Sequence, residues 1–204
     1  MVPPTPSQIL EQIRSHYVTR LRQAIEDHAS DGILTMVPEA ALRGRDGELL
    51  RRGDPPTPVR VDLITLLNEQ VRDGLTIESE TMPGFAPFSL RWKHELPVKI
   101  SPFPWNACPV QFETRSENIQ PILDWFDRWF DPEESKIAGD DGLFSVVHSV
   151  TKTPTQPGFI RLLVDLGSAP IEAFQEMIDA LHAMGIESLE IGAAPTAGTQ
   201  GEPS

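Results

Sequence analysis

The sequence predicts an α+β protein whose second half, residues 109–191, folds as one strand–helix–strand–strand–helix–strand unit. This prediction rests on two amphipathic helical patterns, on short runs in which apolar and polar residues alternate, and on turn-forming residues between them. Residues 7–108 are expected to form a helical and extended N-terminal extension that packs on this unit. Residues 1–6 are expected to be a flexible lead, and residues 192–204 a small, polar, disordered tail.

The N-terminal region starts with an amphipathic helix, in which apolar residues recur at spacings of three and four. Ser7 is the expected N-cap of this helix, and Gly32 its expected end. Residues 33–37 are expected to form a short strand, and residues 38–58 a charged, turn-rich loop that contains one helical turn or a small hairpin. The apolar run at residues 62–74, with an aspartate as its first residue, predicts a second, short helix.

Residues 75–108 change to extended segments that prolines interrupt. Alternating apolar residues predict strands at 88–92 and 96–100. The run 102–105 contains two prolines, which cannot donate hydrogen bonds to a strand ladder. We therefore expect a loop or a sheet edge there.

The second half of the chain has the clearest pattern. Its expected elements are, in order, a strand at 110–113, a helix at 119–130, a strand at 143–150, a reversing loop at 151–158, a strand at 159–166, a helix capped by Ser168 and ended by Gly185, and a strand at 188–191. The first of these helices has a single wide apolar stripe. The strand before the second helix is the most apolar one, which indicates a central position in the sheet.

This order of elements resembles the split βαβ, or ferredoxin-like, sandwich. Right-handed crossovers would place both helices on one face of a four-stranded antiparallel sheet. The N-terminal region is expected to share this core, and the sheet face that the helices leave open is one place where it could pack. Because such folds host unrelated functions, the fold alone indicates no activity.

The formal net charge of −13 disfavours a protein that binds nucleic acid, because phosphate contacts require a concentrated basic surface. The charge favours a basic partner or a basic substrate, although an acidic surface also simply keeps a protein in solution. Thirteen arginines stand against four lysines. We associate this bias with GC-rich bacterial coding sequence, by correlation and not by a physical argument.

The chain has one cysteine, Cys108, so no intrachain disulfide can form and a secreted disulfide scaffold is excluded. The N-terminus lacks the basic and apolar regions of a signal peptide. No run of about 18 apolar residues predicts a membrane span. We therefore expect a cytoplasmic protein without a membrane partner.

An acidic run lies between residues 113 and 141, where nine carboxylates stand against three basic side chains. Asp124, Asp127 and Asp131 fall on one stripe of the predicted helix, opposite its tryptophans. This stripe is interpreted as a docking surface for a basic protein, as a divalent-cation site, or as a solvated helix face. No DxDxDG pattern favours calcium.

The four tryptophans could indicate a ligand-binding box. Trp125 and Trp129 lie at helical spacing, as core residues do. Trp92 and Trp105 lie near prolines and strand edges, so these two are the candidates for exposed contacts.

His148 and Arg161 lie in the two apolar segments of the second half and are candidate residues of an open sheet face. His148 could act there as an acid, a base or a ligand, or it could be a structural histidine. The five histidines have no metal-binding spacing, no nucleotide motif is present, and Cys108 has no neighbouring base. No catalytic residue, metal or cofactor is therefore assigned.

Three classes of function fit these observations. The favoured one is a non-enzymatic interaction protein of inhibitor or immunity type, which docks a basic partner. The second is a small-molecule-binding enzyme or sensor that uses the open face of an antiparallel sheet. The third is a homo-oligomeric structural subunit.

Overall fold

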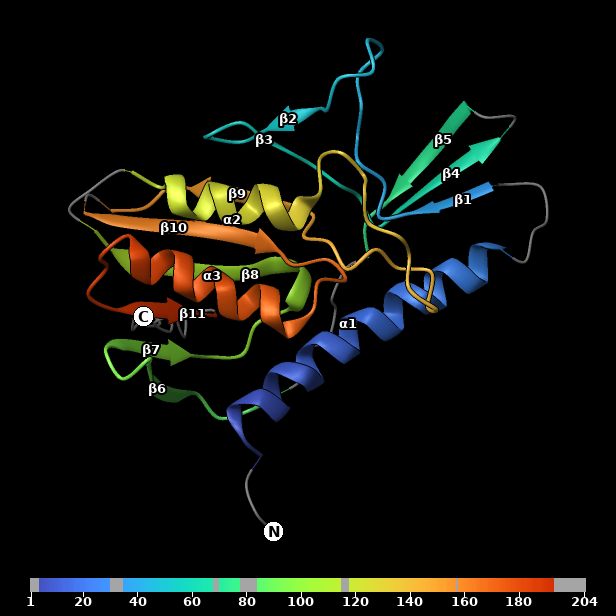
Figure 1. The fold of residues 1–204 in the computed structure, drawn as a ribbon. Helices are drawn as coiled ribbons and strands as arrows, with labels where there is room; N and C mark the ends of the chain where they lie inside the picture. Colours follow the sequence, from blue (N-terminus) through green and yellow to red (C-terminus); the bar gives the residue numbers. More distant parts are fainter. Residues whose placement is uncertain are drawn as a thin grey trace, which may run out of the picture.

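The computed structural model describes most of the chain, namely residues 4–29, 35–67, 70–77, 84–114, 118–156 and 158–192. These residues form a mixed α+β structure, so the predicted class is confirmed (Figure 1). The expected tail, half of the expected lead, and the expected helix end at Gly32 lie outside the described residues.

One unit of the structure follows the chain order strand–helix–strand–strand–helix–strand. Its elements are β8 (Cys108–Glu113), α2 (Gln120–Phe130), β9 (Ser149–Thr153), β10 (Phe159–Asp165), α3 (Ile171–Ala183) and β11 (Leu189–Ile191). The four strands pair antiparallel in the spatial order β11-β8-β10-β9. Both helices lie against one face of this sheet, and β10 has the interior position expected of the most apolar strand (Figure 1).

A hairpin extends this sheet beyond the four strands that the sequence predicts. It consists of β6 (Phe88–Trp92) and β7 (Leu96–Ile100), which confirms both strands expected from alternation. β7 pairs parallel to β11, so the complete sheet has six strands in the order β6-β7-β11-β8-β10-β9. The sheet is therefore mixed and not wholly antiparallel.

The expected N-terminal helix is present as α1 (Pro6–Ala29). Its cap is Thr5 and not Ser7, which lies inside the helix. The Thr5 hydroxyl accepts a hydrogen bond from the Gln8 N–H (3.3 Å), and the Gln8 side-chain oxygen accepts one from the Thr5 N–H (2.8 Å). This reciprocal pair is a capping box with glutamine at its last position.

The apolar stripe of α1 belongs to the same hydrophobic core as the sheet and its helices. The buried residues of this stripe are Ile9, Leu10, Ile13, Tyr17, Val18 and Leu21. Arg14 connects α1 to the segment before α3, because its guanidinium donates hydrogen bonds to the carbonyls of Ser168 (3.0 Å) and Ala169 (2.9 Å). α1 thereby contacts α3 and the short 3-10 helix η1 (Trp105–Ala107).

The helix expected at residues 62–74 is wrong. Those residues contain β4 (Leu63–Leu67) and β5 (Gln70–Leu75), which form a small sheet with β1 (Thr35–Pro38) in the order β1-β4-β5. A short, continuous apolar run fits a buried strand as well as a buried helix, and here pairing on both sides of β4 decided between them. Asp62 caps no helix, because its carboxylate accepts hydrogen bonds from Tyr17 and Ile77.

The turn-rich segment before β4 contains the small hairpin that the sequence allows. Its strands are β2 (Arg51–Arg52) and β3 (Thr57–Pro58). The Thr57 hydroxyl donates a hydrogen bond to the Val150 carbonyl (2.8 Å), which attaches this hairpin to the edge strand β9.

The strand expected at residues 143–150 forms only from Ser149 onward. The residues before it are irregular, because the backbone N–H groups of several of them bond to partners outside the sheet. The N–H of Phe144 donates to the Glu39 carboxylate (2.7 Å), and the N–H of Ser145 donates to the Ser168 hydroxyl (2.9 Å). Ser168 is consequently not the cap of α3, whose N-cap is Pro170.

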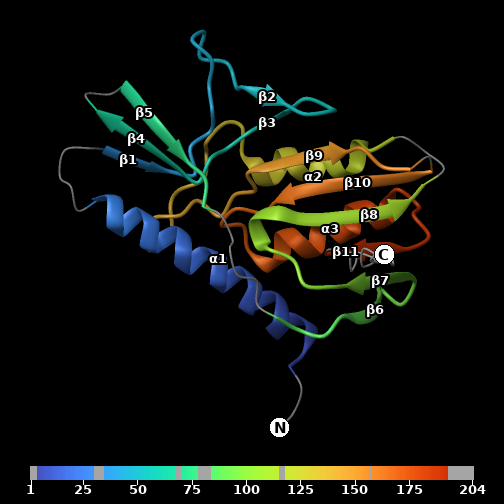
Figure 2. The ribbon, with the colours of Figure 1, turned by 180° about the vertical axis from the view of Figure 1, so that it is seen from behind.

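The second face of the six-stranded sheet has no described helix on it (Figure 2). α1 does not cover this face but runs past one end of the sheet (Figures 1 and 2). No described helix is long and apolar enough to cross a membrane.

We predict that Leu21→Ala lowers the free energy of unfolding by about 2–5 kcal/mol, because it opens a cavity where α1 meets the common core. Urea denaturation followed by tryptophan fluorescence and by far-UV circular dichroism should give coincident transitions for this variant. Thr19→Ala, at an exposed position of the same helix, should change stability by less than about 0.5 kcal/mol. Circular dichroism reports the unfolding of the helices, α1 included, and fluorescence reports the unfolding around the tryptophans. If the two transitions occurred at different urea concentrations, a shared core would be contradicted.

Candidate functional site

An open groove of about 700 Å³ lies on the outer surface of the helix layer, between α2 and α3. Its lining residues are Pro121, Asp124, Trp125, Arg128, Glu176, Asp179 and Ala180. Three of these side chains are carboxylates and one is a guanidinium. The groove is therefore rimmed mainly by negative charge.

Two half-buried tryptophans hold the carboxylates of α3 in place along this groove. Trp129 donates its indole N–H to Glu176 (2.9 Å), which also pairs with Arg128 (3.0 Å). Trp92, from β6, donates its indole N–H to Asp179 (2.6 Å). Burial alone would raise the pKa of Asp179, but hydrogen bonds from Lys93 and Trp92 hold it below its usual value.

The predicted acidic stripe divides into two parts with different roles. Asp124 and Asp127 are exposed, and Asp127 forms no side-chain hydrogen bond or ion pair within the described part of the chain. Asp131 is buried and occupies the left-handed C-cap position of α2, with φ 58°. Its carboxylate accepts hydrogen bonds from the Ser135 hydroxyl (2.7 Å) and from the Lys136 N–H (2.9 Å), so it serves the turn after the helix.

The other predicted site residues lie in three different places. Trp105 is buried in the core, 1 % exposed, so it cannot be part of an exposed contact surface as the sequence suggested. Arg161 is exposed on the open sheet face. His148 is completely buried and faces neither the open sheet face nor the groove of the helix layer.

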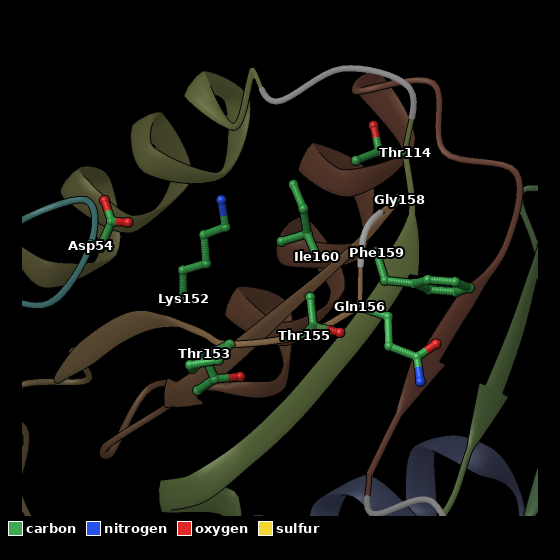
Figure 3. Close-up of a pocket in the computed structure, with 10 residues that line it drawn as sticks. Asp54, Thr114, Lys152, Thr153, Thr155, Gln156, Gly158, Phe159 and Ile160 are labelled. Carbon is green, nitrogen blue, oxygen red and sulfur yellow. The ribbon is translucent and has the colours of Figure 1, made fainter.

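A second hollow, of about 540 Å³, lies at the turn between β9 and β10 (Figure 3). Lys152 and Ile160 stand on one side of the two strands there, while Gln156 and Phe159 turn to the other side (Figure 3). Asp54 approaches from the loop between β2 and β3 (Figure 3). This hollow is open, its lining is polar and apolar in about equal parts, and it adjoins the end of the uncovered sheet face.

A buried ionic cluster is the feature that the sequence did not predict. His148 contributes both ring nitrogens to it: Nε2 lies 2.9 Å from Oε1 of Glu39, and Nδ1 lies 3.2 Å from Oδ1 of Asp62. Asp165, at the end of β10, is 3.7 Å from Nδ1 through its Oδ2. We call Glu39, Asp62, His148 and Asp165 the histidine cluster.

Backbone and hydroxyl donors support each carboxylate of the histidine cluster. Glu39 accepts hydrogen bonds from the N–H groups of Ser168 (3.0 Å) and Phe144 (2.7 Å). Asp165 accepts a hydrogen bond from the N–H of Gly167 (3.0 Å) through its Oδ1. Asp62 is held by the Tyr17 hydroxyl and by the N–H of Ile77.

The electrostatics of the cluster favour ionised Glu39 and Asp62. Burial alone would raise the pKa of each carboxyl, but the His148 ring and the hydrogen bonds to each group hold both pKa values below the usual range. Burial does raise the pKa of Asp165, although His148 opposes the shift. Burial alone would lower the pKa of His148, yet the surrounding carboxylates, Asp165 foremost, hold it well above 6.5.

Arg60 crosses beside the histidine cluster without pairing with Asp62 or Asp165. Its guanidinium donates to the carbonyls of Glu39 (2.7 Å), Phe130 (2.9 Å) and Asp131 (2.9 Å). The bonds to Phe130 and Asp131 connect the N-terminal region to the end of α2, whereas the bond to Glu39 lies within that region. Arg60 therefore lies near Glu39 but forms no ion pair with Asp62 or Asp165 in the described part of the chain.

Sequence reasoning found Asp124, Asp127 and Trp92 but missed the α3 side of the groove and three members of the histidine cluster. Glu176 and Asp179 follow from helical spacing only once the packing of α2 on α3 is known. Glu39, Asp62 and Asp165 come from segments that are far apart in the chain. Their one local signal is a charged residue at the boundary of an apolar run.

Comparison with known proteins found no matching family model, no matching curated protein and no matching solved structure.

We predict that Asp131→Asn lowers the free energy of unfolding at pH 7 by about 1–2 kcal/mol, because it weakens charge-assisted hydrogen bonds to the turn after α2. The pKa of Asp131 is lowered in the folded protein, since the N–H of Lys136 and the Ser135 hydroxyl outweigh the effect of burial. Its stabilisation is thus present above about pH 3.9, the unfolded value, and is lost as pH falls through the folded pKa.

Urea titrations of both proteins between pH 2.5 and 7 measure this difference. The gap between wild type and Asp131→Asn should close at the acid end of the series. Asp127→Asn, on the exposed part of the same stripe, should stay within about 0.5 kcal/mol of wild type throughout. Equal effects of both substitutions at pH 7 would contradict the capping role.

Proposed function

We propose that the protein is an acidic interaction protein, of inhibitor or immunity type, that docks a basic segment of a partner protein on the groove between α2 and α3. The observation that carries the proposal is the placement of three carboxylates around this groove, with Asp127 exposed on the same helix. A basic side chain that enters the groove can pair with Asp124 or Glu176 and pack its aliphatic part near Trp125.

Preorganisation of the groove supports this reading. Glu176 and Asp179 are fixed by indole N–H donors and by ion pairs, so little side-chain freedom is lost when a cation binds. The net charge of −13 adds long-range attraction for a basic partner. Such attraction acts mainly on the rate of association and on specificity.

Two finer proposals accompany this function. The unit of β8 to β11 is proposed to be of ferredoxin-like type, which its order of elements and its antiparallel strand order β11-β8-β10-β9 support. A cytoplasmic location is proposed on the basis of the single cysteine, a buried free thiol.

The test is binding of a fluorescent peptide of eight lysines and arginines, measured by fluorescence anisotropy. The double variant Asp124→Lys/Asp127→Lys should bind at least about tenfold more weakly than wild type, because like charges then face the peptide. Raising the salt concentration should also weaken the binding to wild type, and the salt dependence should be smaller for the variant.

The matched control is Glu26→Lys/Glu48→Lys, which changes the net charge by the same amount at exposed positions outside the groove. This control should keep most of the wild-type affinity. Equal losses in the two double variants would mean that only the overall charge attracts the peptide. Affinity that ignores both salt and the groove substitutions would remove the proposal.

The second candidate function is binding of a small anionic ligand on the open sheet face. The observation that favours it is a row of polar residues in register across five strands: Lys99, Glu190, Gln111, Arg161 and Thr153. Lys99 pairs with Glu190 (3.4 Å), whereas Arg161 has no side-chain partner in the described ranges. An enzyme or sensor of this kind would hold its ligand through Arg161.

Thermal-shift measurements with small phosphates and dicarboxylates test this second function. A ligand that stabilises wild type should lose that effect in Arg161→Gln and keep it in Arg45→Gln, an exposed loop arginine. If no such ligand stabilises wild type, or if both variants respond alike, the open face is not a ligand site of this class.

A further inference from the structure

We propose that the histidine cluster is a binding site for one divalent transition-metal ion, held by His148 Nδ1 and by one carboxylate oxygen each of Asp62 and Asp165. The three donor atoms lie within 4.8 Å of one another. This site is separate from the groove of the helix layer and from the open face, so it does not depend on the proposed docking function.

The two ring nitrogens of His148 have different environments. Nε2 makes a hydrogen bond with Glu39, whose carboxylate is itself fixed by two backbone N–H groups. Nδ1 is fully buried and has no hydrogen-bond partner among the described residues, although two carboxylates are close to it. The contact with Asp62 lacks the direction of a hydrogen bond, and the contact with Asp165, at 3.7 Å, is too long for one. The imidazole thus presents Nδ1 to a space between two anions, where a cation fits.

A histidine that donates one N–H to a carboxylate and offers its other nitrogen is the usual arrangement of a metal-binding histidine. Glu39 would act here as the positioning residue that fixes the tautomer and the ring plane. Tyr17, Ile77 and Gly167 do the same for the carboxylates, through hydrogen bonds to Asp62 and Asp165.

The donor spacing suits a transition-metal ion. Two ligands of a tetrahedral zinc site are about 3.4 Å apart, as bond lengths of about 2.0–2.1 Å require. Nδ1 lies 3.2 Å from Asp62 and 3.7 Å from Asp165. All three donor atoms lie within 4.8 Å of one another, so the two carboxylates would move closer together around a bound ion. A mixed nitrogen and oxygen donor set favours Zn²⁺ over Mg²⁺ or Ca²⁺, which take oxygen ligands.

Charge balance is a second reason to expect a metal ion in the histidine cluster. The cluster contains three carboxylates and a single imidazole, and no described lysine or arginine forms an ion pair with Asp62 or Asp165. Excess negative charge in a buried position is costly unless it is paired or coordinates a metal. Access is available from the side of Asp165, whose side chain is 17 % exposed.

The experiment measures metal binding by the full chain after treatment with EDTA and removal of the chelator. Calorimetric titration with Zn²⁺ should show one ion bound per chain, and Co²⁺ in its place should give visible absorption bands of nitrogen and oxygen coordination. Asp165→Asn, which removes one ligand charge at nearly constant shape, should weaken Zn²⁺ binding at least about tenfold. Glu26→Gln, at an exposed carboxylate outside every proposed site, should leave the affinity unchanged.

Nitrogen-15 NMR of the histidine rings gives a second readout. Addition of Zn²⁺ would not change the His148 signals if the cluster were purely structural. Addition of Zn²⁺ should shift Nδ1 of His148 while Nε2 keeps its proton, and this measurement uses wild type, so it stands even if Asp165→Asn fails to fold. Absence of stoichiometric binding, a shift at another histidine only, or unchanged affinity in a folded Asp165→Asn protein would each overturn the proposal.

Discussion

The contact of the His148 imidazole with Glu39 and Asp62 is the constraint on which the rest of the structure depends. Glu39 and Asp62 belong to the N-terminal region, whereas His148 directly precedes β9 of the large sheet. Burying ionised groups costs several kcal/mol for each ion, so the contact persists only where every group has donors or opposite charge around it. The hydrogen bonds from Ser168, Phe144, Tyr17 and Ile77 meet this condition. The N-terminal region is consequently held in one fixed position against the large sheet.

Two irregular features of the backbone follow from this constraint. Residues 143–148 do not continue β9, because the N–H groups of Phe144 and Ser145 donate to Glu39 and Ser168, and that of Val147 donates to the Trp129 carbonyl. Gly167, with φ +51°, passes so close to the imidazole that a Cβ atom would lie 2.4 Å from Cδ2 of His148. A side chain cannot be accommodated there, which explains why a glycine ends the β10 segment. Both features are local irregularities that a non-local contact requires.

The periodicity of apolar residues predicts the helices and strands whose formation depends on local sequence. It fails where pairing with distant segments determines the structure. α2, α3, β6 and β7 agree with their apolar patterns, because each buries one face against a single core. Residues 62–74 form strands instead of a helix, since the run itself does not show that β4 pairs with β5 inside it and with β1 outside it. The site follows the same rule: Asp124 and Asp127 were predicted from helical spacing, but Glu39 and His148 are separated by 109 positions and no spacing rule connects them.

The acidic run shows why net charge alone is a coarse guide to a binding surface. Part of the run is already used inside the molecule: Asp131 caps α2, Glu134 pairs with Arg43 (2.8 Å), and Asp141 pairs with Arg22. These contacts hold segments of the chain together, and none of the three carboxylates lines the groove between α2 and α3. The charge that remains for a partner lies on the outer side of α2 and α3, where Asp124 and Asp127 face solvent. The surface proposed for docking is thus narrower than the sequence suggested, because only part of the acidic run lies on or beside the groove.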